Sequence, residues 1–460
     1  MTESVRYDIV ILGGGSGGYA CALRAAELGQ RVALIEKDKV GGTCLHRGCI
    51  PTKALLHAAE IADHARDSAA VGIRATFEGV DMAGVNDYKD KVVDRLWKGL
   101  QGTLASRKVE MIYGDGRLVS PTAVQVGDTV YEGGHVVLAT GSQARTLPGL
   151  DIDGVRVILS DQALTLDRVP GSVVILGGGV IGVEFASVWR SFGADVTIVE
   201  MTPHLVPTED ESSSKLLERA FRRRGIKFEL GVRFESVKES SDGGVTVTLE
   251  GGKTLDAELL LVAVGRGAVS ADLGYEEAGV PIERGVVTVD EYCQTPVPTI
   301  SAVGDLTRGP QLAHVGFAEG ILVAERLAGL PVTPIDYDGV PRVTYSDPEV
   351  ASVGLTSAMA AERGIETAEV VYNLGGNGKS VILQTSGAAK VIAVAGGGPV
   401  IGVHLVGARV GELITEAQLI YNWEALPAEV AQLIHPHPTQ SEMIGEASLV
   451  LAGKPLHYHS

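Results

Sequence analysis

The chain has 460 residues and a formal net charge of −18 at pH 7. An acidic surface of this kind repels phosphate backbones, which argues against nucleic acid as a partner. The length predicts two to four domains, and four cysteines are too few for a disulfide framework in a chain of this size.

The longest apolar stretch, residues 391–408, contains Pro399, His404 and several glycines. It therefore predicts strands and a turn rather than a membrane span. The first strand-like run begins at Tyr7, which leaves no room for a targeting segment ahead of it. We expect a soluble protein of the reducing cytoplasm, without a metal site, in which Cys21 and Cys293 are structural.

An apolar run over residues 7–12 leads into a glycine-rich segment, an alanine-rich helix and a second strand over 31–36. The order strand, G-x-G-x-x-G, helix, strand, acid is typical of a dinucleotide-binding fold. The glycines let the backbone approach a pyrophosphate at the N-terminus of the helix, where free N–H groups and the dipole favour an anion. The residues of this first site are Gly13, Gly15 and Gly18, with Glu36 placed to accept hydrogen bonds from a ribose.

Two cysteines, Cys44 and Cys49, lie five positions apart in a segment rich in glycine. They can form a disulfide if a tight or distorted turn brings their Cα atoms within about 7 Å, which a regular helix does not do easily. If a helix begins near Pro51, the ammonium of Lys53 lies one turn from the second sulfur and favours its thiolate. The alternative is that both cysteines are small apolar residues in a loop, and the spacing alone does not decide.

A second unit repeats the first at a fixed offset. A strand pattern leads into Gly177, Gly179 and Gly182, and the following strand ends at Glu200. The differences 177−13, 179−15, 182−18 and 200−36 are all 164, so we predict two dinucleotide sites. No lysine or arginine occurs from 201 to 214, and Glu200 would repel a 2′-phosphate, so the second site should prefer NAD over NADP.

Glu184 is an acid in the first turns of the helix that should hold the second pyrophosphate, where the first unit has Ala20. Compensation of the helix dipole accounts for an acid there, at roughly 0.3–1 kcal/mol. The alternative is that Glu184 is the partner of Lys53.

Three later strand patterns end in residues that suit a nucleotide site. Residues 135–142 and 259–266 each have a glycine as the next-to-last residue and predict the return strands that close the two units. Residues 299–305 place Asp305 at a strand end, where it can bind sugar hydroxyls or serve as an ordinary turn residue.

The chain changes character after about residue 338. Strands are predicted at 342–345, 390–394 and 400–406, and an amphipathic helix at 424–434. Prolines then fix the backbone of a His-Pro-His-Pro segment, so that its imidazoles cannot lie on a helical face. Glu442 follows His437 by five positions and is placed to orient its ring, leaving the other nitrogen as a base.

Gly-Gly-Thr-Cys-x4-Cys-Ile-Pro-x-Lys, the two dinucleotide motifs and the terminal His-x-His-Pro-Thr-x-Ser-Glu together resemble the pyridine nucleotide–disulfide oxidoreductases over essentially the whole chain. The resemblance implies an α/β fold with two Rossmann-like dinucleotide-binding domains, for FAD and NAD, and a C-terminal α+β dimerisation domain that makes an obligate homodimer. The implied domains are 1–148 for FAD, 149–270 for NAD, 271–338 as a central domain completing the FAD site, and 339–460 as the interface.

The resemblance also implies roles by position. Cys44 resembles the thiol that meets the substrate and Cys49 the thiol against the flavin. Lys53 and Glu184 resemble the ion pair beside the flavin, and His437, held by Glu442, resembles a base supplied across the dimer interface. The further FAD contacts implied are Gly42, Thr43, Gly116, Thr140, Gly141, Ser142, Asp305, Gln311, Leu312, Ala313 and His314. Those implied for NAD are Val180, Ile181 and Gly265, beside the glycines and Glu200.

Within the family, the chain is most similar to members that oxidise protein-bound dihydrolipoamide with NAD. The resemblance thus implies this reaction, and a lipoyl domain of a 2-oxo acid dehydrogenase or glycine cleavage complex as partner. The rival interpretations are a reductase of another disulfide, of the mycothione or glutathione type, and a flavin-binding scaffold without turnover. Three departures from the family pattern concern the substrate channel: Leu-His-Arg-Gly in the cysteine loop, Asp347, and Pro436.

Overall fold

The computed structural model describes residues 4–241 and 243–458. The chain divides into two compact units, each built from three segments. The first unit comprises residues 1–54, 83–145 and 265–337, and the second comprises 55–82, 146–264 and 338–460.

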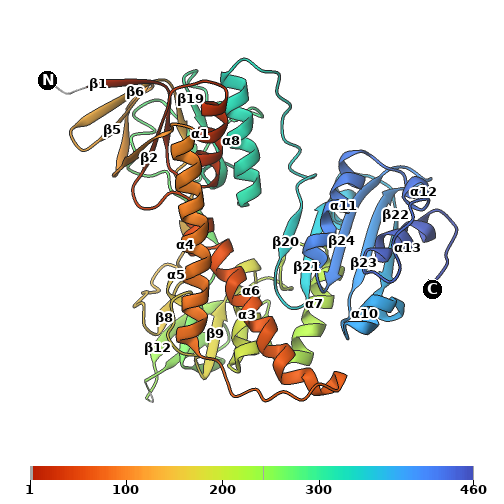
Figure 1. Ribbon diagram of the computed structural model, residues 1–460. Coiled ribbons are helices and arrows are strands. Elements are labelled where there is room, and N and C mark those ends of the chain that lie inside the picture. The colour runs from red at the N-terminus through yellow and green to blue at the C-terminus, as the bar shows by residue number, and fades with distance from the viewer. Residues whose placement is uncertain (1–3, 242, 459–460) are drawn as a thin grey trace. The chain divides into compact units, whose positions relative to one another are not determined.

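The first unit is built on a seven-stranded sheet in the order β3-β2-β1-β6-β5-β4, with β19 paired to β6 (Figure 1). Strands β3, β2, β1, β6 and β19 run parallel, and β5 and β4 are antiparallel additions. The strands are β1 Ser4–Leu12, β2 Val32–Glu36, β3 Glu110–Tyr113, β4 Gly116–Ser120, β5 Ala123–Val126, β6 Thr129–Leu138 and β19 Ile300–Ala302. Since β19 belongs to the predicted central segment, that segment contributes a strand to the first sheet.

Helices and short ribbons complete this unit. The helices are α1 Ser16–Glu27, α2 Gly42–Arg47, α3 Cys49–Asp67, α4 Met82–Ser106 and α8 Ala313–Leu327, with a 3₁₀ turn η2 at Gly304–Leu306. The ribbon strands are β7 Ser142–Ala144, β16 Arg266–Ala268, β17 Ile282–Glu283 and β18 Val286–Val287. Helix α3 begins in the first unit and ends in the second.

Burial on both faces explains the near-continuous apolar sequence of the first strand. Ile9 and Ile11 face a core formed with α1 and α8, which lie side by side in Figure 1. Val10 and Leu12 point to the opposite core, which includes the buried Tyr275.

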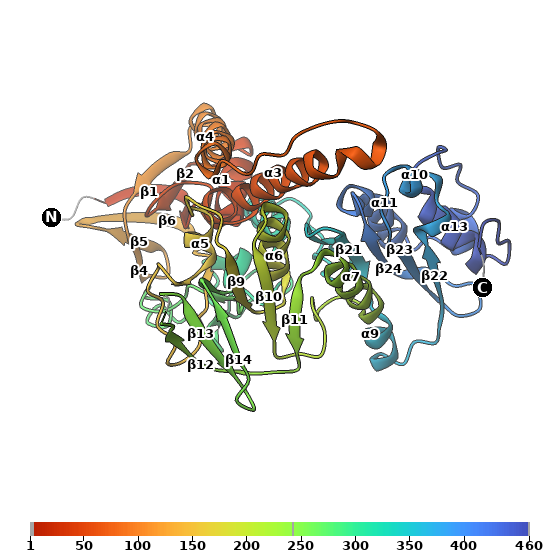
Figure 2. The same ribbon diagram turned by 90° about the horizontal axis from the view of Figure 1, so that it is seen from below.

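The second unit contains a parallel sheet in the order β11-β10-β9-β15-β8 and an antiparallel ribbon β12-β13-β14 (Figure 2). These strands are β8 Val157–Ile158, β9 Ser172–Leu176, β10 Asp195–Glu200, β11 Lys227–Leu230, β12 Phe234–Glu239, β13 Val245–Leu249, β14 Thr254–Ala257 and β15 Leu259–Val262. Its helices are α5 Ser160–Ala163, α6 Val180–Phe192 and α7 Glu211–Arg224, and the segment from α3 adds η1 Ser68–Val71.

The C-terminal part of the second unit has a five-stranded antiparallel sheet, β20-β21-β24-β23-β22. The strands are β20 Arg342–Thr344, β21 Glu349–Gly354, β22 Thr367–Asn373, β23 Ala388–Val394 and β24 Val400–Gly407. The helical elements are α9 Ser357–Glu362, η3 Leu374–Gly376, α10 Gly378–Ile382, α11 Val410–Asn422, α12 Pro427–Val430 and α13 Glu442–Leu451. The predicted fold class, two α/β nucleotide folds followed by an α+β domain, is confirmed, whereas the four domain boundaries stay a prediction.

The prediction of an amphipathic helix at 424–434 is wrong. Glu424 has a left-handed backbone, with φ of +52°, and the helix that follows begins at Pro427 and ends after four residues. Proline suits the first position of a helix and disfavours helical backbone in the residue before it, so the helix cannot extend upstream. Ile434 is 97% exposed, whereas Val430 is buried.

Candidate active site

The first glycine of each dinucleotide motif has a left-handed backbone, with φ of +108° at Gly13 and +110° at Gly177. A Cβ atom added there would lie 2.2 Å from the carbonyl oxygen of Ala139 or 2.3 Å from that of Ala263. Only glycine therefore lets the return strand pass so close to the turn. The offset here is 263−139 = 124 rather than 164, because α2, α3 and α4 lengthen the first unit.

The last glycine of each motif packs its helix against this turn. A Cβ atom on Gly18 would lie 1.8 Å from the carbonyl oxygen of Gly13, and one on Gly182 would lie 1.9 Å from that of Gly177. The middle glycines differ, because a Cβ atom on Gly15 or Gly179 would meet no atom within 4 Å. Each is the N-cap of its helix, α1 or α6, and thus borders open space where free N–H groups suit a pyrophosphate. The residues present therefore fit the pyrophosphate of a dinucleotide in each loop, and the assignment of FAD to the first loop and NAD to the second stays a prediction.

Glu36 is the last residue of β2 and Glu200 is the last residue of β10, as predicted. The carboxylate of Glu36 accepts the N–H of Gly14 at 2.7 Å, and that of Glu200 accepts the N–H of Gly178 at 2.7 Å. The second oxygen of each accepts a backbone N–H two residues further along the chain, at 2.9 Å and 2.8 Å. Each acid therefore fixes its own glycine loop and stands at the position predicted for the ribose.

The two cysteines lie on either side of a break between helices. Cys44 is in α2 and Cys49 begins α3, and Gly48 between them has non-helical angles, φ −145° and ψ −112°. A hydrogen bond between the two side chains, together with burial, raises the pKa of the Cys44 thiol, and the nearby Lys53 charge opposes this. The distorted turn expected from the spacing thus brings the sulfurs together, which favours a redox pair over two unrelated apolar residues.

A chain of polar contacts leads from the cysteine loop to Asp305. Arg266 donates to the hydroxyl of Thr43 at 3.3 Å, and to the hydroxyl and carbonyl oxygens of Ser142 at 2.8 Å and 2.6 Å. The Ser142 hydroxyl donates to the Asp305 carboxylate. Three residues predicted to contact FAD are therefore connected through Arg266, which the sequence reasoning missed. Its position directly after Gly265, at the end of the return-strand pattern predicted at 259–266, was the available signal.

The remaining predicted FAD residues have identifiable structural surroundings. The Thr140 hydroxyl donates to the carbonyl of Val269 at 2.7 Å, and Gly141 has φ of +69°. A Cβ atom on Gly116 would lie 2.5 Å from the Leu12 side chain, so packing alone requires a glycine there. The segment 311–314 leads into and begins α8, where the N-terminal N–H groups of the helix lie. Their contacts with FAD stay predictions.

In the second unit, Val180 and Ile181 form the first turn of α6, beside Gly182. Gly265, which begins the last segment of the first unit, has φ of +103°, which glycine adopts readily. The side chain of Glu184 is buried, and its carboxylate accepts the N–H of Tyr345 at 2.9 Å. Lys53 belongs to the first unit and Glu184 to the second, and their ion pair stays a prediction.

The predicted base has its orienting acid. Nδ1 of His437 lies 2.9 Å from the Glu442 carboxylate, whose other oxygen accepts the N–H of Thr439 at 2.8 Å. Burial would raise the pKa of Glu442, but the bonds from Thr439 and His437 hold it below its usual range. The His437 side chain is 76% exposed, so Nε2 is available to a thiol outside this unit.

A second histidine of the same segment, His435, also has an acidic partner, which the sequence reasoning missed. Nε2 of His435 lies 2.6 Å from Glu416 in α11, and this hydrogen bond raises the pKa of His435. A Cβ atom on Gly445 would lie 2.6 Å from the His435 ring. His435 therefore packs closely against α13, the helix that begins with Glu442.

Two of the departures from the family pattern have structural explanations. Arg47 of the cysteine loop pairs with Asp38, and Nε2 of His46 lies 3.0 Å from the carbonyl of Val40. The carboxylate of Asp347 lies 3.3 Å from Arg224 in α7, and its N–H donates to Ser187 in α6 at 3.1 Å. These residues hold neighbouring elements in place.

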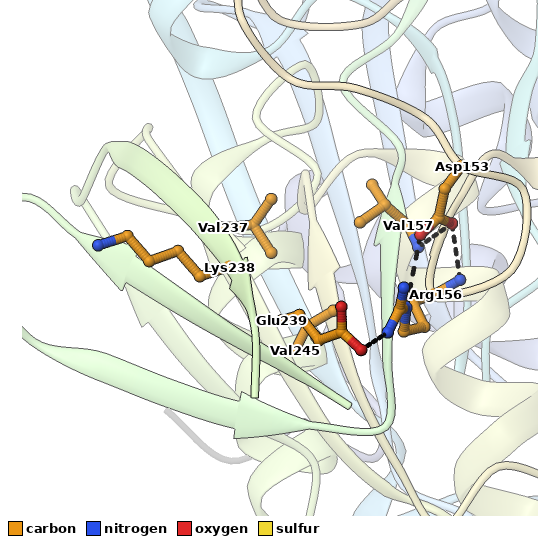
Figure 3. A pocket seen from close by; sticks show the side chains of 7 residues that line it. All are labelled: Asp153, Arg156, Val157, Val237, Lys238, Glu239 and Val245. Atoms are coloured by element: carbon orange, nitrogen blue, oxygen red, sulfur yellow. Dashed lines mark hydrogen bonds and ion pairs between the residues drawn. The ribbon is translucent and has the colours of Figure 1, made fainter. Parts of the chain in front are cut away.

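A surface hollow of about 220 Å³ lies between β8 and the β12–β13 ribbon (Figure 3). Arg156 at its edge pairs with Glu239, and Asp153 accepts three backbone N–H groups at 2.7–2.9 Å. None of the predicted site residues lines this hollow, and its charges are already paired, apart from Lys238, which points away from it in Figure 3.

Over residues 4–241 and 243–458, no helix combines the length and the apolar sequence needed to cross a bilayer. The same residues contain no group of three or more His, Cys, Asp or Glu side chains arranged to hold a metal ion.

Comparisons with known proteins agree with this geometry. A family model described as pyridine nucleotide-disulphide oxidoreductase matches residues 7–320, and the model of the family's dimerisation domain matches 340–448. A dihydrolipoyl dehydrogenase of Bacillus subtilis is 40% identical over 473 residues, covering 99% of this chain and 100% of the relative.

Two solved structures are also similar to the chain. LpdA from Mycobacterium tuberculosis has a TM-score of 0.89 at 28% identity, covering 97% of this chain and 99% of that one. The HOCl-induced flavoprotein disulfide reductase RclA from Escherichia coli, as its Cu(II) complex, has a TM-score of 0.88 at 28% identity, with 97% and 100% covered. The chain is therefore an enzyme of the pyridine nucleotide-disulphide oxidoreductase family, a flavin-dependent disulfide oxidoreductase that uses FAD and NAD and carries the family's dimerisation domain.

Proposed function

We propose that this enzyme oxidises protein-bound dihydrolipoamide to lipoamide with reduction of NAD. The observation that carries the proposal is the hydrogen-bonded pair Cys44–Cys49 in a chain that is 40% identical to a dihydrolipoyl dehydrogenase from end to end. The His437–Glu442 pair adds a base suited to a thiol substrate.

In the proposed reaction, Cys44 and Cys49 begin as a disulfide. His437 takes a proton from one substrate thiol, and the resulting thiolate attacks the sulfur of Cys44. The bond between the two cysteines breaks and Cys49 leaves as a thiolate, whose charge Lys53 stabilises. The second substrate thiol then attacks the mixed disulfide, so that lipoamide is released and Cys44 is reduced. The substrate loses two electrons and two protons. The cysteine pair gains the two electrons, one proton stays on His437, and the proton of the second substrate thiol passes to Cys44, which leaves as a thiol.

The two glycine loops supply the cofactor sites of this proposal. Gly13, Gly15 and Gly18 with Glu36 would hold FAD, and Ser142 and Asp305 would bind its sugar chain. The residues that would hold NAD are Gly177, Gly179, Gly182 and Glu200. Bound FAD supplies the exchange between the two electrons of a dithiol and the hydride of a nicotinamide. Glu200 is buried and bonded to its own loop, which favours NAD because a 2′-phosphate there would meet a fixed negative charge.

We further propose a cytoplasmic homodimer whose subunits each lend His437 to the partner's cysteines, and a lipoyl domain as the docking protein. The dimerisation domain at 340–448 and the exposure of His437 support this arrangement. Analytical ultracentrifugation and pull-down with a lipoylated domain would test the two statements separately.

A second candidate function is the reduction of another disulfide with a nicotinamide as electron donor. The similarity to RclA, a flavoprotein disulfide reductase, supports this second function. A steady-state comparison of dihydrolipoamide, glutathione and mycothiol with NAD and NADP separates the two. We expect dihydrolipoamide with NAD to have the highest kcat/KM; a higher value for either other thiol would refute the lipoamide assignment.

Two substitutions test the residue roles. Cys49→Ser should abolish lipoamide turnover while FAD remains bound, and retained turnover would contradict the redox pair. His437→Gln should lose roughly 10²- to 10⁴-fold in kcat. His457→Gln is the matched control, because His457 also bonds an acid, Glu446, at 2.8 Å and is 69% exposed. Equal losses in both variants would show that a general structural effect, not base catalysis, was measured.

A further inference from the structure

Glu319 in helix α8 is a fully buried acid to which neither the predicted site nor the proposed reaction gives a role. One carboxylate oxygen accepts the N–H of Gly304 at 2.5 Å, and the other accepts the hydroxyl of Tyr337 at 2.7 Å. Space around it is tight, because a Cβ atom on Gly309 would lie 3.0 Å from the carboxylate. Burying a carboxylate is costly unless hydrogen-bond donors satisfy it, so the fold must keep both of these donors in place beside Glu319.

The bond to Gly304 matters because Gly304 begins the turn that carries Asp305. Gly304 has φ of +74°, and η2 is a single 3₁₀ turn, Gly304–Leu306. A turn this short has few hydrogen bonds of its own, so an external charged acceptor has a large share in fixing it. Asp305 in turn accepts the Ser142 hydroxyl, and both residues belong to the FAD site of the proposed function.

Helix α8 is itself fixed against the first phosphate loop. A Cβ atom on Gly320 would lie 2.3 Å from the carbonyl oxygen of Gly17, and one on Gly316 would lie 3.2 Å from the Gly17 N–H nitrogen. The backbones of α8 and α1 are thus in contact at Gly320, the residue that follows Glu319. The N-terminal turn of α8 also carries Ala313 and His314, two of the predicted FAD contacts.

We propose that Glu319 is a positioning residue for FAD, which holds the Asp305 turn at a set distance from α8 and from the pyrophosphate loop on α1. It joins the Asp305 turn and Tyr337 to α8, and it touches Asp305 only through the backbone of Gly304. The inference rests on the proposed function, since it takes Asp305 to be a ligand of FAD. Tyr337 satisfies the second oxygen and is the last residue of the first unit.

The test uses the full chain from which FAD has been removed, titrated with FAD and followed by quenching of flavin fluorescence. Glu319→Gln keeps the size of the side chain but removes the charge. We expect the dissociation constant for FAD to rise about tenfold, which is about 1.4 kcal/mol, with a changed visible spectrum of the bound flavin. The matched control is Glu325→Gln on the same helix, whose acid pairs with Arg24 at 2.6 Å, and its FAD affinity should not change.

Asp305→Asn separates this inference from the function on which it rests. If Asp305→Asn leaves FAD affinity unchanged, Asp305 is not a ligand and the assigned FAD site fails. If Asp305→Asn weakens FAD binding and Glu319→Gln does not, within twofold, the positioning role alone is overturned. The double variant should bind FAD no more weakly than Asp305→Asn, and fully additive losses would also overturn the proposal.

Tyr337→Phe provides a second variant should Glu319→Gln fail to fold. It leaves the bond to Gly304 in place, so FAD affinity should stay within about twofold of the wild type. A tenfold loss in Tyr337→Phe would show that the carboxylate acts through the Tyr337 side, contrary to the proposal. A fall in thermal stability of the apoprotein with unchanged FAD affinity in either variant would assign Glu319 a purely structural role.

Discussion

Gly179→Ala should separate nucleotide binding from folding, because the structure leaves room for the added methyl group. Gly179 has φ of −75° and ψ of −174°, angles that alanine adopts without strain, and its Cβ atom would meet nothing within 4 Å. Replacing glycine restricts the unfolded chain, which stabilises the protein by about 0.4–1 kcal/mol. Alanine is a poorer N-cap than glycine by a similar amount. We therefore expect the free energy of unfolding to change by less than about 1 kcal/mol.

Binding of NAD should respond differently. In the proposed NAD site, the backbone at Gly179 must approach a pyrophosphate, and a methyl group there would keep the phosphate away from the N–H groups of α6. We expect the dissociation constant for NAD to rise tenfold or more, which is about 1.4 kcal/mol. Isothermal titration with NAD measures this, urea unfolding measures stability, and the FAD content is an internal control, because the first loop is unchanged.

Gly182→Ala is the matched contrast. Its Cβ atom would lie 1.9 Å from the carbonyl oxygen of Gly177, far inside van der Waals contact, and overpacking of this kind costs about 1–3 kcal/mol or more. This variant should lose stability as well as NAD binding. Wild-type affinity for NAD in Gly179→Ala, or wild-type stability in Gly182→Ala, would refute the reasoning from loop geometry.

Four further outcomes are expected. Lys390→Met should lower the free energy of unfolding by about 3 kcal/mol, because the substitution leaves the buried Asp210, 3.0 Å away, without its cation. Urea unfolding measures this loss, and a loss below about 1 kcal/mol would contradict the prediction. Burial opposes ionisation of Asp210, but hydrogen bonds and nearby cations hold its pKa below the ordinary 3.8, so its contribution to stability is present above pH 3.8 and is lost as the pH falls further. The stability difference between wild type and Asp210→Asn should accordingly shrink in acid, and a difference that stays constant down to pH 2 would refute this sign. Glu442→Gln should lower kcat at least about tenfold by loosening the His437 ring while KM for NAD is unchanged, and an unchanged kcat would show that the ring needs no orienting acid. Glu200→Gln should weaken NAD binding without giving tight binding of NADP, because the side chain also holds its own glycine loop, and a full switch to NADP would contradict this.

The sequence by itself determined the two nucleotide loops and the cysteine turn. These features depend on backbone angles that only particular residues adopt readily, such as those of the left-handed Gly13 and Gly177, and such angles are set within a few residues. The fixed offset of 164 corresponds to equivalent hydrogen bonds at Glu36 and Glu200, because the acid of each dinucleotide motif accepts an N–H of its own glycine loop. The pairing of His437 with Glu442 was predictable for the same reason, because the two residues are only five positions apart.

The tertiary structure alone decided the contacts between distant segments. Arg266 and Ser142 are 124 residues apart in sequence, and no local pattern says which oxygen a long, flexible guanidinium will reach. Glu319 looks like an ordinary helical acid in the sequence, and only the fold buries it between Gly304 and Tyr337. The helix expected at 424–434 does not form upstream of Pro427, because proline disfavours helical backbone in the residue before it. Val430 is buried, whereas Ile434 is exposed. Burial and long-range pairing are properties of the packed chain, so the sequence indicates candidates for them and the fold selects among the candidates.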